Sequence, residues 1–385
     1  MSGPQAVVVG GGLAGIAAAV AVAKAGLETV HLAPKAPPDR RTSALMMPSV
    51  AYLQSAGLIG DPAEVGHPLT QIRIIDATNR LIRSPETLFD SQEAGLAAFA
   101  WNFANLKLLE RFEAALTGLG NLTTVEQSVT SLEQVAEGWQ LELSDGSSLT
   151  APLVVGSDGK KSLVRVAAGF RARESGFTES ALVCDLELSR PLGGASVEFH
   201  YPRGPFTLVP AGGHKANLVW IDDREVLKAA QAEGAEGLRR IFIEKSQRLF
   251  GDIKLLTPAH MFLLSTLSVD EAGHDGVVLA GEAAHAFPPI GAQGLNLGLR
   301  DVADLSASLA GVDLGSPGWA VKVSEDYSRR RSADLGRTGV MVDTLFRSLL
   351  SELLPAQAVR AGGLWALKLS PQLRRQAFSV GMGVR

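Results

Sequence analysis

A glycine-rich turn near the amino terminus constrains the fold more than any other feature of this sequence. The β-branched run Ala6–Val9 is followed directly by Gly10-Gly11-Gly12-Leu13-Ala14-Gly15, which satisfies G-x-G-x-x-G, and then by the Ala/Val-rich segment Leu13–Lys24, a predicted helix. The glycines permit a tight turn and close backbone approach, and the helix N-terminus offers N–H groups to a pyrophosphate. The pattern predicts a βαβ dinucleotide-binding unit; a glycine turn that only packs tightly is the alternative. The residues predicted at the dinucleotide are Gly10, Gly12, Leu13, Ala14 and Gly15.

Further strand candidates predict a discontinuous cofactor domain. Buried-strand runs recur at 153–155 and 277–280, and strand-like stretches separated by turn residues lie between them. The predicted fold class is α/β, a doubly wound parallel sheet with an inserted antiparallel β-sheet substrate domain and C-terminal helices. The expected boundaries are 1–70, 98–178 and 271–330 for the cofactor domain, 71–97 and 179–270 for the substrate domain, and 331–385 for the C-terminal helical region.

Composition narrows the partners and the compartment. The net charge is −4 and no block of Lys or Arg interleaves with aromatic residues, so a nucleic-acid partner is not expected. Cys184 is the only cysteine, which excludes an internal disulfide framework and a cysteine-based metal cluster and fits a reducing compartment, by default the cytoplasm. Cys184 itself is expected to be a small buried hydrophobe. No metal site is predicted.

Two further segments each follow a strand candidate and carry a glycine turn. The first is Val154-Val155-Gly156-Ser157-Asp158-Gly159; the second begins Gly281-Glu282-Ala283-Ala284-His285 and continues through Pro288 to Asn296. A strand that ends in glycine plus a carboxylate can bring an acceptor to ribityl or ribose hydroxyls. A glycine turn that opens a helix presents N–H donors to an anionic flavin ring or phosphate.

Together the three segments resemble the fingerprint set of the group A flavoprotein hydroxylases, which share a para-hydroxybenzoate hydroxylase-like fold. The flanking residues most resemble the ubiquinone-biosynthesis branch of that family. They are Arg41-Thr-Ser-Ala-Leu45, Asn105, Gly204-Pro205, Leu218-Val-Trp220 and Arg360-Ala-Gly-Gly-Leu364. The resemblance spans nearly the whole chain. It implies FAD as the bound cofactor, NAD(P)H or a reductase as the electron donor, and molecular oxygen as co-substrate.

The resemblance also implies which residues lie at the FAD. Gly10, Gly12 and Gly15 would approach the pyrophosphate, and Glu282 would face the ribityl–pyrophosphate region. The segment 289–296 would lie along the isoalloxazine, with the backbone N–H groups of its last two residues near the pyrimidine edge. The other cofactor-binding residues that the resemblance implies are Arg41, Asn105, Asp158, Gly281, Pro289, Gly291, Gly294, Leu295 and Asn296.

Three positions depart from the family pattern. Ala33 stands where a ribose-binding Glu is usual, Glu282 stands where Asp is usual, and Ala292 replaces a glycine of the quinone branch. The first two bear on FAD affinity, because a carboxylate is missing at one place and displaced by a methylene at the other. Asp39 and the two arginines after it are candidate substitutes for the missing ribose anchor, with solvated surface charge as the alternative.

The implied reaction is hydroxylation of an aromatic ring by a flavin C4a-hydroperoxide, so no catalytic side chain is predicted. The expected substrate is a small aromatic molecule, for which the resemblance points to a polyprenylated phenol or quinone precursor in ubiquinone biosynthesis. His285 is assigned a structural role, because no partnered carboxylate stands at a recognisable spacing. Apolar residues must hold the ring and exclude water, with ordinary sheet core as the alternative. The candidate pocket residues are Pro289, Phe206, Leu208 and Trp220.

Two alternative functions stay open at this stage. One is a flavin-dependent reductase or dehydrogenase of an isoprenoid substrate on the same fold. The other is a non-catalytic scaffold in a quinone-biosynthesis complex, suggested by Ala33 and Glu282. The C-terminal segment 349–378 also has two interpretations, peripheral contact with anionic lipid or helical packing with solvated arginines. Its relevant residues are Trp365, Lys368, Leu369, Arg374 and Arg375.

Overall fold

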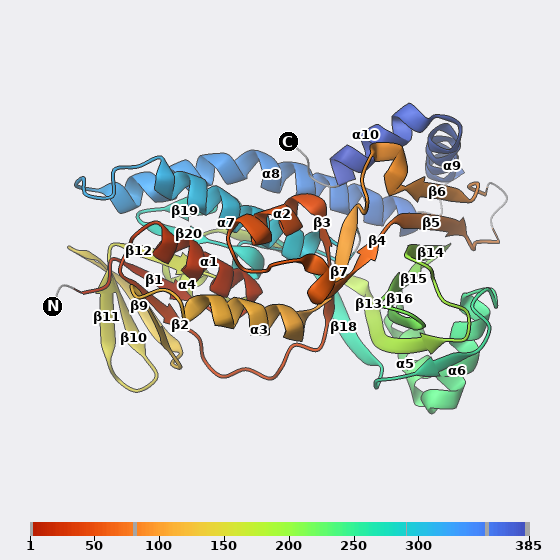
Figure 1. Cartoon of the computed structure of the whole chain (residues 1–385), viewed down its shortest axis with the longest axis horizontal. Coiled ribbons are helices and arrows are strands. Elements are labelled where there is room, and N and C mark those ends of the chain that lie inside the picture. Colours follow the sequence, from red (N-terminus) through yellow and green to blue (C-terminus); the bar gives the residue numbers. More distant parts are fainter. Residues whose placement is uncertain (1–2, 80–82, 290, 351–353, 382–385) are drawn as a thin grey trace.

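The computed structural model of the chain describes residues 3–79, 83–289, 291–350 and 354–381 (Figure 1). At its centre is a six-stranded sheet in the order β19-β20-β12-β1-β2-β8, in which only β19 runs antiparallel to its neighbour. Its strands are β1 (Ala6–Val9), β2 (Thr29–Leu32), β8 (Leu122–Val125), β12 (Leu153–Gly156), β19 (Gly273–His274) and β20 (Val277–Leu279). β1, β12 and β20 are buried throughout, which explains their apolar composition.

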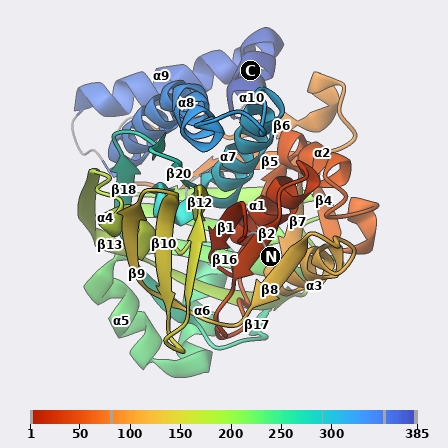
Figure 2. The same ribbon diagram turned by 90° about the vertical axis from the view of Figure 1, so that its left-hand side faces the viewer.

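The strand order decides where the three glycine turns meet. β20, β12 and β1 are consecutive neighbours, side by side in Figure 2, and each leads into one of the predicted turns. Because parallel strands end at the same edge of a sheet, the turns after Val9, Gly156 and Leu279 emerge together. The predicted convergence of the three motifs is confirmed at the level of the backbone.

Helices and a small sheet cover the central sheet. Helices α1 (Leu13–Lys24) and α7 (Gln293–Ala310) pack against each other, and both share one apolar core with the central strands. The strands β9 (Val129–Val135), β10 (Gly138–Leu143) and β11 (Ser148–Ala151) form a three-stranded antiparallel sheet, and a turn with Asp145-Gly146 joins the last two. The remaining helices and 3-10 turns of this region are α2 (Met47–Ser55), η1 (Pro62–Glu64), α3 (Asn105–Leu116), α4 (Leu163–Ala167) and η3 (Gly281–Ala283).

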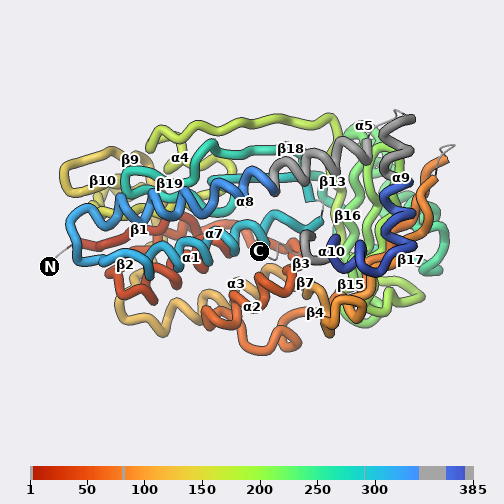
Figure 3. Tube along the Cα trace, turned by 90° about the horizontal axis from the view of Figure 1, so that it is seen from above, coloured from red at the N-terminus to blue at the C-terminus, as the bar shows by residue number. Residues whose placement is uncertain are grey.

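A second, largely antiparallel sheet has the order β21-β18-β13-β16-β15-β14-β5-β6, with β17 on β13. Figure 3 shows β13 and β18 running between the two regions. The predicted boundary after residue 178 therefore falls inside β13. The strands are β5 (Gln71–Asp76), β6 (Thr87–Asp90), β13 (Ala172–Leu188), β14 (Ala195–Tyr201), β15 (Gly204–Pro210), β16 (Lys215–Asp223), β17 (Ile253–Leu255), β18 (His260–Val269) and β21 (His285–Ala286). Helices α5 (Arg224–Ala232) and α6 (Gly234–Lys245) belong to the same region.

A small sheet and three C-terminal helices complete the chain. β7 (Ala100–Ala104) lies between β3 (Thr42–Met46) and β4 (Gly66–Leu69). Helix α8 (Trp319–Leu350) packs on α7, while α9 (Leu354–Leu369) and α10 (Pro371–Gly381) lie beside β6 and the 3-10 turn η2 (Ser91–Ala94). No helix in the described part of the chain is long and apolar enough to cross a bilayer.

Candidate flavin site

The first glycine turn leaves no room for side chains at two of its positions. An added Cβ would lie 1.9 Å from the carbonyl oxygen of Gly10 if placed on Gly15, and 2.2 Å from the carbonyl oxygen of Ser157 if placed on Gly10. Gly10 also has φ +128°, a conformation that side chains disfavour. Gly12 is exposed with nothing within 4 Å of an added Cβ, so its space is open to a ligand.

Contacts between the turns confirm that they form one site. The added Cβ of Gly10 would lie 3.0 Å from the backbone nitrogen of Asp158. A Cβ on Gly281 would lie 3.1 Å from the Cβ of Ala14, and one on Gly298 would lie 3.6 Å from the same atom. Turns that are about 150 and 270 residues apart in sequence are thus in van der Waals reach of one another.

Two helices begin at this site without side-chain caps. The N-cap residues of α1 and α7 are Gly12 and Ala292, and neither makes a side-chain capping hydrogen bond. Ala292 has φ +54°, and Gly294 in the first turn of α7 is exposed. The first N–H groups of an uncapped helix need acceptors, and their partial positive charge favours an anion. A pyrophosphate and an electron-rich flavin ring supply such acceptors, so these residues fit a flavin dinucleotide.

In the second glycine turn, Asp158 forms its hydrogen bonds with residues that follow it closely in the sequence. The carboxylate of Asp158 accepts hydrogen bonds from Ser162 Oγ at 2.5 Å and from the backbone nitrogens of Leu163 and Val164 at 2.7 and 3.2 Å. These bonds cap the short helix α4. The structure therefore gives Asp158 a capping role, and its direct contact with FAD stays a prediction.

Arg165 is a site residue that sequence reasoning did not select. Its side chain is 8% exposed, and its guanidinium donates to the carbonyl oxygens of Ala283 at 2.8 Å and Lys160 at 2.7 Å. It therefore ties the second glycine turn to the third. No local pattern marks this role, because the two acceptors are backbone atoms on separate segments.

Asp39, Arg41 and Asn105 form a polar cluster between the end of β2 and α3. Arg41 donates to both carboxylate oxygens of Asp39, at 2.8 and 2.9 Å, and the Asn105 amide donates to the same carboxylate at 2.8 Å. The hydrogen bond that Arg41 donates to Asp39 and the nearby charge of Glu282 both raise the pKa of Arg41. The cluster thus holds the Asp39 carboxylate in place, and its role as a substitute ribose anchor stays a prediction.

The third turn is held by side chains on α7. Asn296 accepts from the backbone nitrogen of Met46 at 2.8 Å and donates to the carbonyl oxygens of Ala44 at 2.8 Å and Ala292 at 2.6 Å. The Asn296 side chain thereby fixes β3 against the start of α7. Glu282, Pro289, Gly291 and Gly294 remain exposed, while Gly281 is buried. The predicted contacts of Leu295 and Gly291 with FAD stay predictions.

His285 has the carboxylate partner that its sequence spacing did not reveal. Its Nε2 donates to Asp301 at 2.6 Å, and the same oxygen accepts from the backbone nitrogen of Gly281 at 2.8 Å. Arg331 on α8 pairs with Asp301 at 2.7 Å and with Asp304 and Asp334 at 2.8 and 2.7 Å. His285, Asp301 and Arg331 are at most 2% exposed, which supports the structural assignment of His285.

Three of the residues predicted to line the substrate pocket, Phe206, Leu208 and Trp220, lie in the hydrophobic core of the second sheet. All three are at most 1% exposed and pack into the core between the second sheet and α5 and α6. Trp220 and Phe206 both lie against Phe242 of α6, with ring centroids 6.3 and 5.9 Å apart. Side chains alternate between the faces of a strand, so Thr207 and Val209 point the opposite way.

Cys184 lies on the same buried face, as expected of a small hydrophobe. It is 6% exposed, and burial, with a smaller contribution from the charge of Asp185, raises the pKa of its thiol to about 12. A thiol with that pKa stays protonated at neutral pH and is a poor nucleophile.

An apolar cluster fills the space where the small sheet, the second sheet and the third turn meet. We call it the interdomain cluster. Its buried members are Met46, Leu69, Phe99 and Ala100, and the half-buried residues packed on them are Ala44, Ile72, Phe89, Val209 and Ala292. Because Ala292 lies within the segment 289–296 that is predicted to hold the flavin ring, this cluster is an apolar surface next to that segment.

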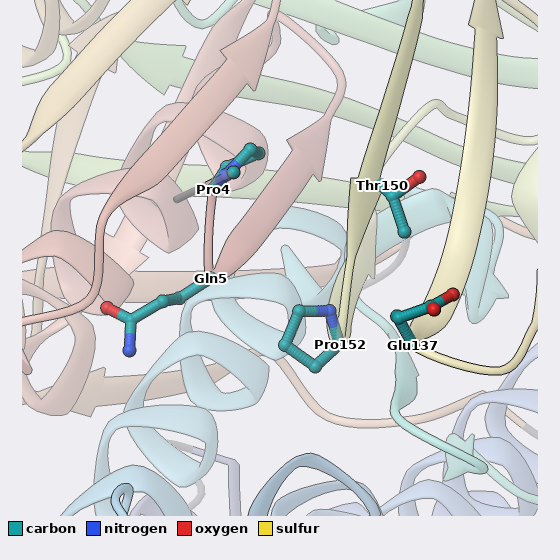
Figure 4. Close-up of a pocket in the computed structure, with 6 residues that line it drawn as sticks. Pro4, Gln5, Glu137, Thr150 and Pro152 are labelled. Carbon is teal, nitrogen blue, oxygen red and sulfur yellow. The ribbon is translucent and has the colours of Figure 1, made fainter. Parts of the chain in front are cut away.

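A surface depression elsewhere has no part in this site. It has a volume of about 400 Å³ and is lined by Gly3, Pro4, Gln5, Glu137, Thr150 and Pro152 (Figure 4). Gln5 and Pro152 precede β1 and β12, so it lies at the amino ends of the parallel strands. Ligands of open α/β sheets bind at the carboxyl ends, where the glycine turns lie.

The fold and the three glycine turns at the carboxyl ends of β1, β12 and β20 fit a flavoprotein that binds FAD. The FAD binding domain family model matches residues 4–334. The chain belongs to this family and is an FAD-dependent monooxygenase that hydroxylates an aromatic ring. It works with reducing equivalents from NAD(P)H and with molecular oxygen. Bound FAD supplies the redox chemistry, and the chain positions the flavin and the substrate.

Individual relatives agree with this assignment. Ubiquinone hydroxylase UbiL of Rhodospirillum rubrum is 30% identical over 98% of this chain and 89% of its own. The 3-demethoxyubiquinol 3-hydroxylase of Escherichia coli is 27% identical over 98% of both chains. The crystal structure of p-nitrophenol 4-monooxygenase PnpA from Pseudomonas putida has the same fold, with a TM-score of 0.79, 21% identity and 99% and 98% coverage. These relatives favour an enzyme over the scaffold alternative.

Replacing Arg165 by Met is expected to weaken FAD binding. The substitution removes two hydrogen bonds from a charged donor and leaves the Ala283 carbonyl oxygen without this partner, so the dissociation constant of FAD should rise by about tenfold or more. Fluorescence titration of the apoprotein with FAD measures this change. Arg171→Met, at a side chain that is 89% exposed, is the matched control. Wild-type FAD affinity in the Arg165 variant would show that the link between the turns is dispensable.

Proposed function

We propose that this enzyme hydroxylates the ring of a polyprenylated phenol or quinone precursor in ubiquinone biosynthesis. The observation that carries the proposal is the interdomain cluster, which presents half-buried Ile72, Phe89 and Val209 next to Ala292 of the flavin turn. Apolar walls bind an apolar ring and tail and exclude water from the reacting centre. The names of the curated relatives, which include ubiquinone hydroxylases, support the same substrate class.

The proposal also includes the place in the cell where the enzyme works. The single, buried cysteine is consistent with a reducing cytoplasm, and a polyprenylated substrate resides in the membrane. We infer that the enzyme works in the cytoplasm at the membrane surface, where it can join other enzymes of the pathway in a complex. The direct FAD contacts of Arg41, Asn105, Asp158 and Glu282 belong to the same proposal.

Labelled dioxygen gives the direct test of the reaction. The FAD-loaded enzyme is incubated with NAD(P)H, labelled dioxygen and a phenol that carries a short prenyl chain, and the products are analysed by mass spectrometry. One labelled oxygen atom should enter the ring, because a monooxygenase transfers one oxygen atom to its substrate. Reduced product without label would identify a reductase instead.

The interdomain cluster is tested by Val209→Thr, which keeps the shape of the side chain and adds a hydroxyl. The kcat/KM for the prenylated phenol should fall by about tenfold, because the hydroxyl must be desolvated when the apolar substrate binds. Val226→Thr, on a side chain of α5 that is 46% exposed, is the control. Equal kcat/KM in wild type and Val209→Thr would remove Val209 from the substrate site.

A further inference from the structure

The C-terminal part of the chain carries a charge opposite to that of the whole. Residues 354–385 contain Arg360, Lys368, Arg374, Arg375 and Arg385 and no acidic residue, while the net charge of the chain is −4. An excess of positive charge on one segment of an acidic protein favours contact with an anionic surface.

Large apolar side chains are exposed on the same helices. Trp365 and Leu369 of α9 are 48% and 75% exposed, and Leu373 of α10 is 42% exposed. The ammonium of Lys368 lies 5.6 Å from the centre of the Trp365 ring. Exposed Trp and Leu next to cations are typical of helices that lie in the interface of a bilayer, where the apolar groups enter the acyl region and the cations meet lipid phosphates.

These helices lie beside the β5–β6 ribbon, which contributes two residues to the interdomain cluster. The α9 helix contacts β6, and Arg374 of α10 pairs with both carboxylate oxygens of Glu93 in η2 at 2.7 and 2.8 Å (Figure 1). In the neighbouring strands, Ile72 of β5 and Phe89 of β6 are cross-strand partners and both belong to the interdomain cluster. The helices that carry the exposed apolar side chains therefore pack against the ribbon that contributes Ile72 and Phe89 to the interdomain cluster.

We propose that α9 and α10 form a docking surface for an anionic lipid bilayer. We call this surface, made of Trp365, Lys368, Leu369, Leu373 and Arg375, the C-terminal face. Contact through it places the β5–β6 ribbon at the bilayer, so that a lipid-soluble substrate reaches the interdomain cluster without crossing water. The proposal rests on the proposed function for the nature of the substrate, but docking itself depends only on the C-terminal face.

Vesicle binding by the full FAD-loaded chain tests the docking surface. Wild type is expected to float with phosphatidylglycerol/phosphatidylcholine vesicles and to be released by high salt, while binding to pure phosphatidylcholine is weak. The double variant Lys368→Gln/Arg375→Gln should lower the partition coefficient by about 25-fold, since each cation near an anionic surface contributes roughly a fivefold effect. Leu369→Ser should lower it by about tenfold or more.

Matched variants elsewhere separate docking from general surface effects. Leu263→Ser removes a Leu that is 66% exposed on β18, and Arg240→Gln removes a cation whose side chain is 72% exposed on α6. Both are expected to bind vesicles as wild type does. Yellow absorbance confirms that every variant holds FAD. Equal binding by wild type and the C-terminal face variants, or no salt-sensitive binding by wild type, would overturn the docking surface.

The same preparations distinguish this inference from the proposed function. Hydroxylation of a water-soluble short-chain phenol without vesicles reports on the reaction alone. Product formation together with an absence of vesicle binding by wild type overturns docking and leaves the proposed function standing. Vesicle binding that depends on Lys368, Leu369 and Arg375 supports docking even if no prenylated phenol is hydroxylated.

Discussion

Gly15→Ala is expected to abolish FAD binding and to destabilise the fold by about 3 kcal/mol or more. The new Cβ would lie 1.9 Å from the Gly10 carbonyl oxygen, and neither atom can rotate away, because the helix backbone fixes the position of the Cβ and the oxygen is itself a backbone atom. The α1 helix must therefore move away from β1, which displaces the N–H groups that the cofactor needs. The flavin absorbance of the purified protein and chemical unfolding of the apoprotein measure the two effects.

Two other glycine variants separate cofactor binding from stability. Gly12→Ala meets no atom within 4 Å, so the apoprotein should be as stable as wild type, while FAD affinity falls because the methyl group enters the open space at the turn. Gly60→Ala also meets no atom and lies outside the turns, so it should change neither property. A yellow Gly15→Ala protein with wild-type stability would contradict the assignment of this turn.

Asp301→Asn is expected to lower the free energy of unfolding by about 3–5 kcal/mol, because it leaves buried Arg331 and His285 without their shared carboxylate. It also removes the acceptor for Gly281, so FAD affinity should fall with stability. Asp326→Asn is the matched control, because its partners Arg329 and Arg330 are more exposed and such pairs contribute about 1 kcal/mol or less. Similar losses in the two variants would contradict a special role for the buried network.

The effect of Asp301→Asn should depend on pH. Burial alone raises the pKa of Asp301, but the charges of His285 and Arg331 and the hydrogen bonds to its carboxylate outweigh burial, so the pKa lies below its ordinary value of 3.8. A pKa depressed in the folded state gives stabilisation that is present above the ordinary value and is lost as the pH falls through the folded value. The difference in unfolding free energy between wild type and variant should be full above about pH 5 and shrink below about pH 4.

The cofactor half of the site could be predicted from local patterns. Gly10, Gly12 and Gly15 follow a β-branched run and open a helix, which is enough to indicate a dinucleotide turn. The segments at Gly156 and Gly281 likewise each follow a buried strand. Such turns depend on the backbone conformation of a few consecutive residues, and the sequence records that requirement directly as glycine.

The substrate half could not be predicted in the same way. Phe206 and Trp220 are large apolar strand residues, but β15 also carries Val209 and Thr207 on the opposite face. Alternation shows that the two faces differ and does not show which one meets the flavin. That choice depends on α5 and α6, which cover the aromatic face, and their docking is a long-range event.

The sequence by itself determined the βαβ start, the three glycine turns and hence the flavin class, because each of these depends on neighbouring residues. Only the tertiary structure decided that β20, β12 and β1 are adjacent and that Arg165 links two turns. It also decided that Asp301 joins His285 to Arg331, and which face of the second sheet α5 and α6 cover. These features arise from contacts between segments far apart in the chain. Tertiary packing decides which side chains meet there, so the contacting residues have no fixed spacing in the sequence that could be recognised.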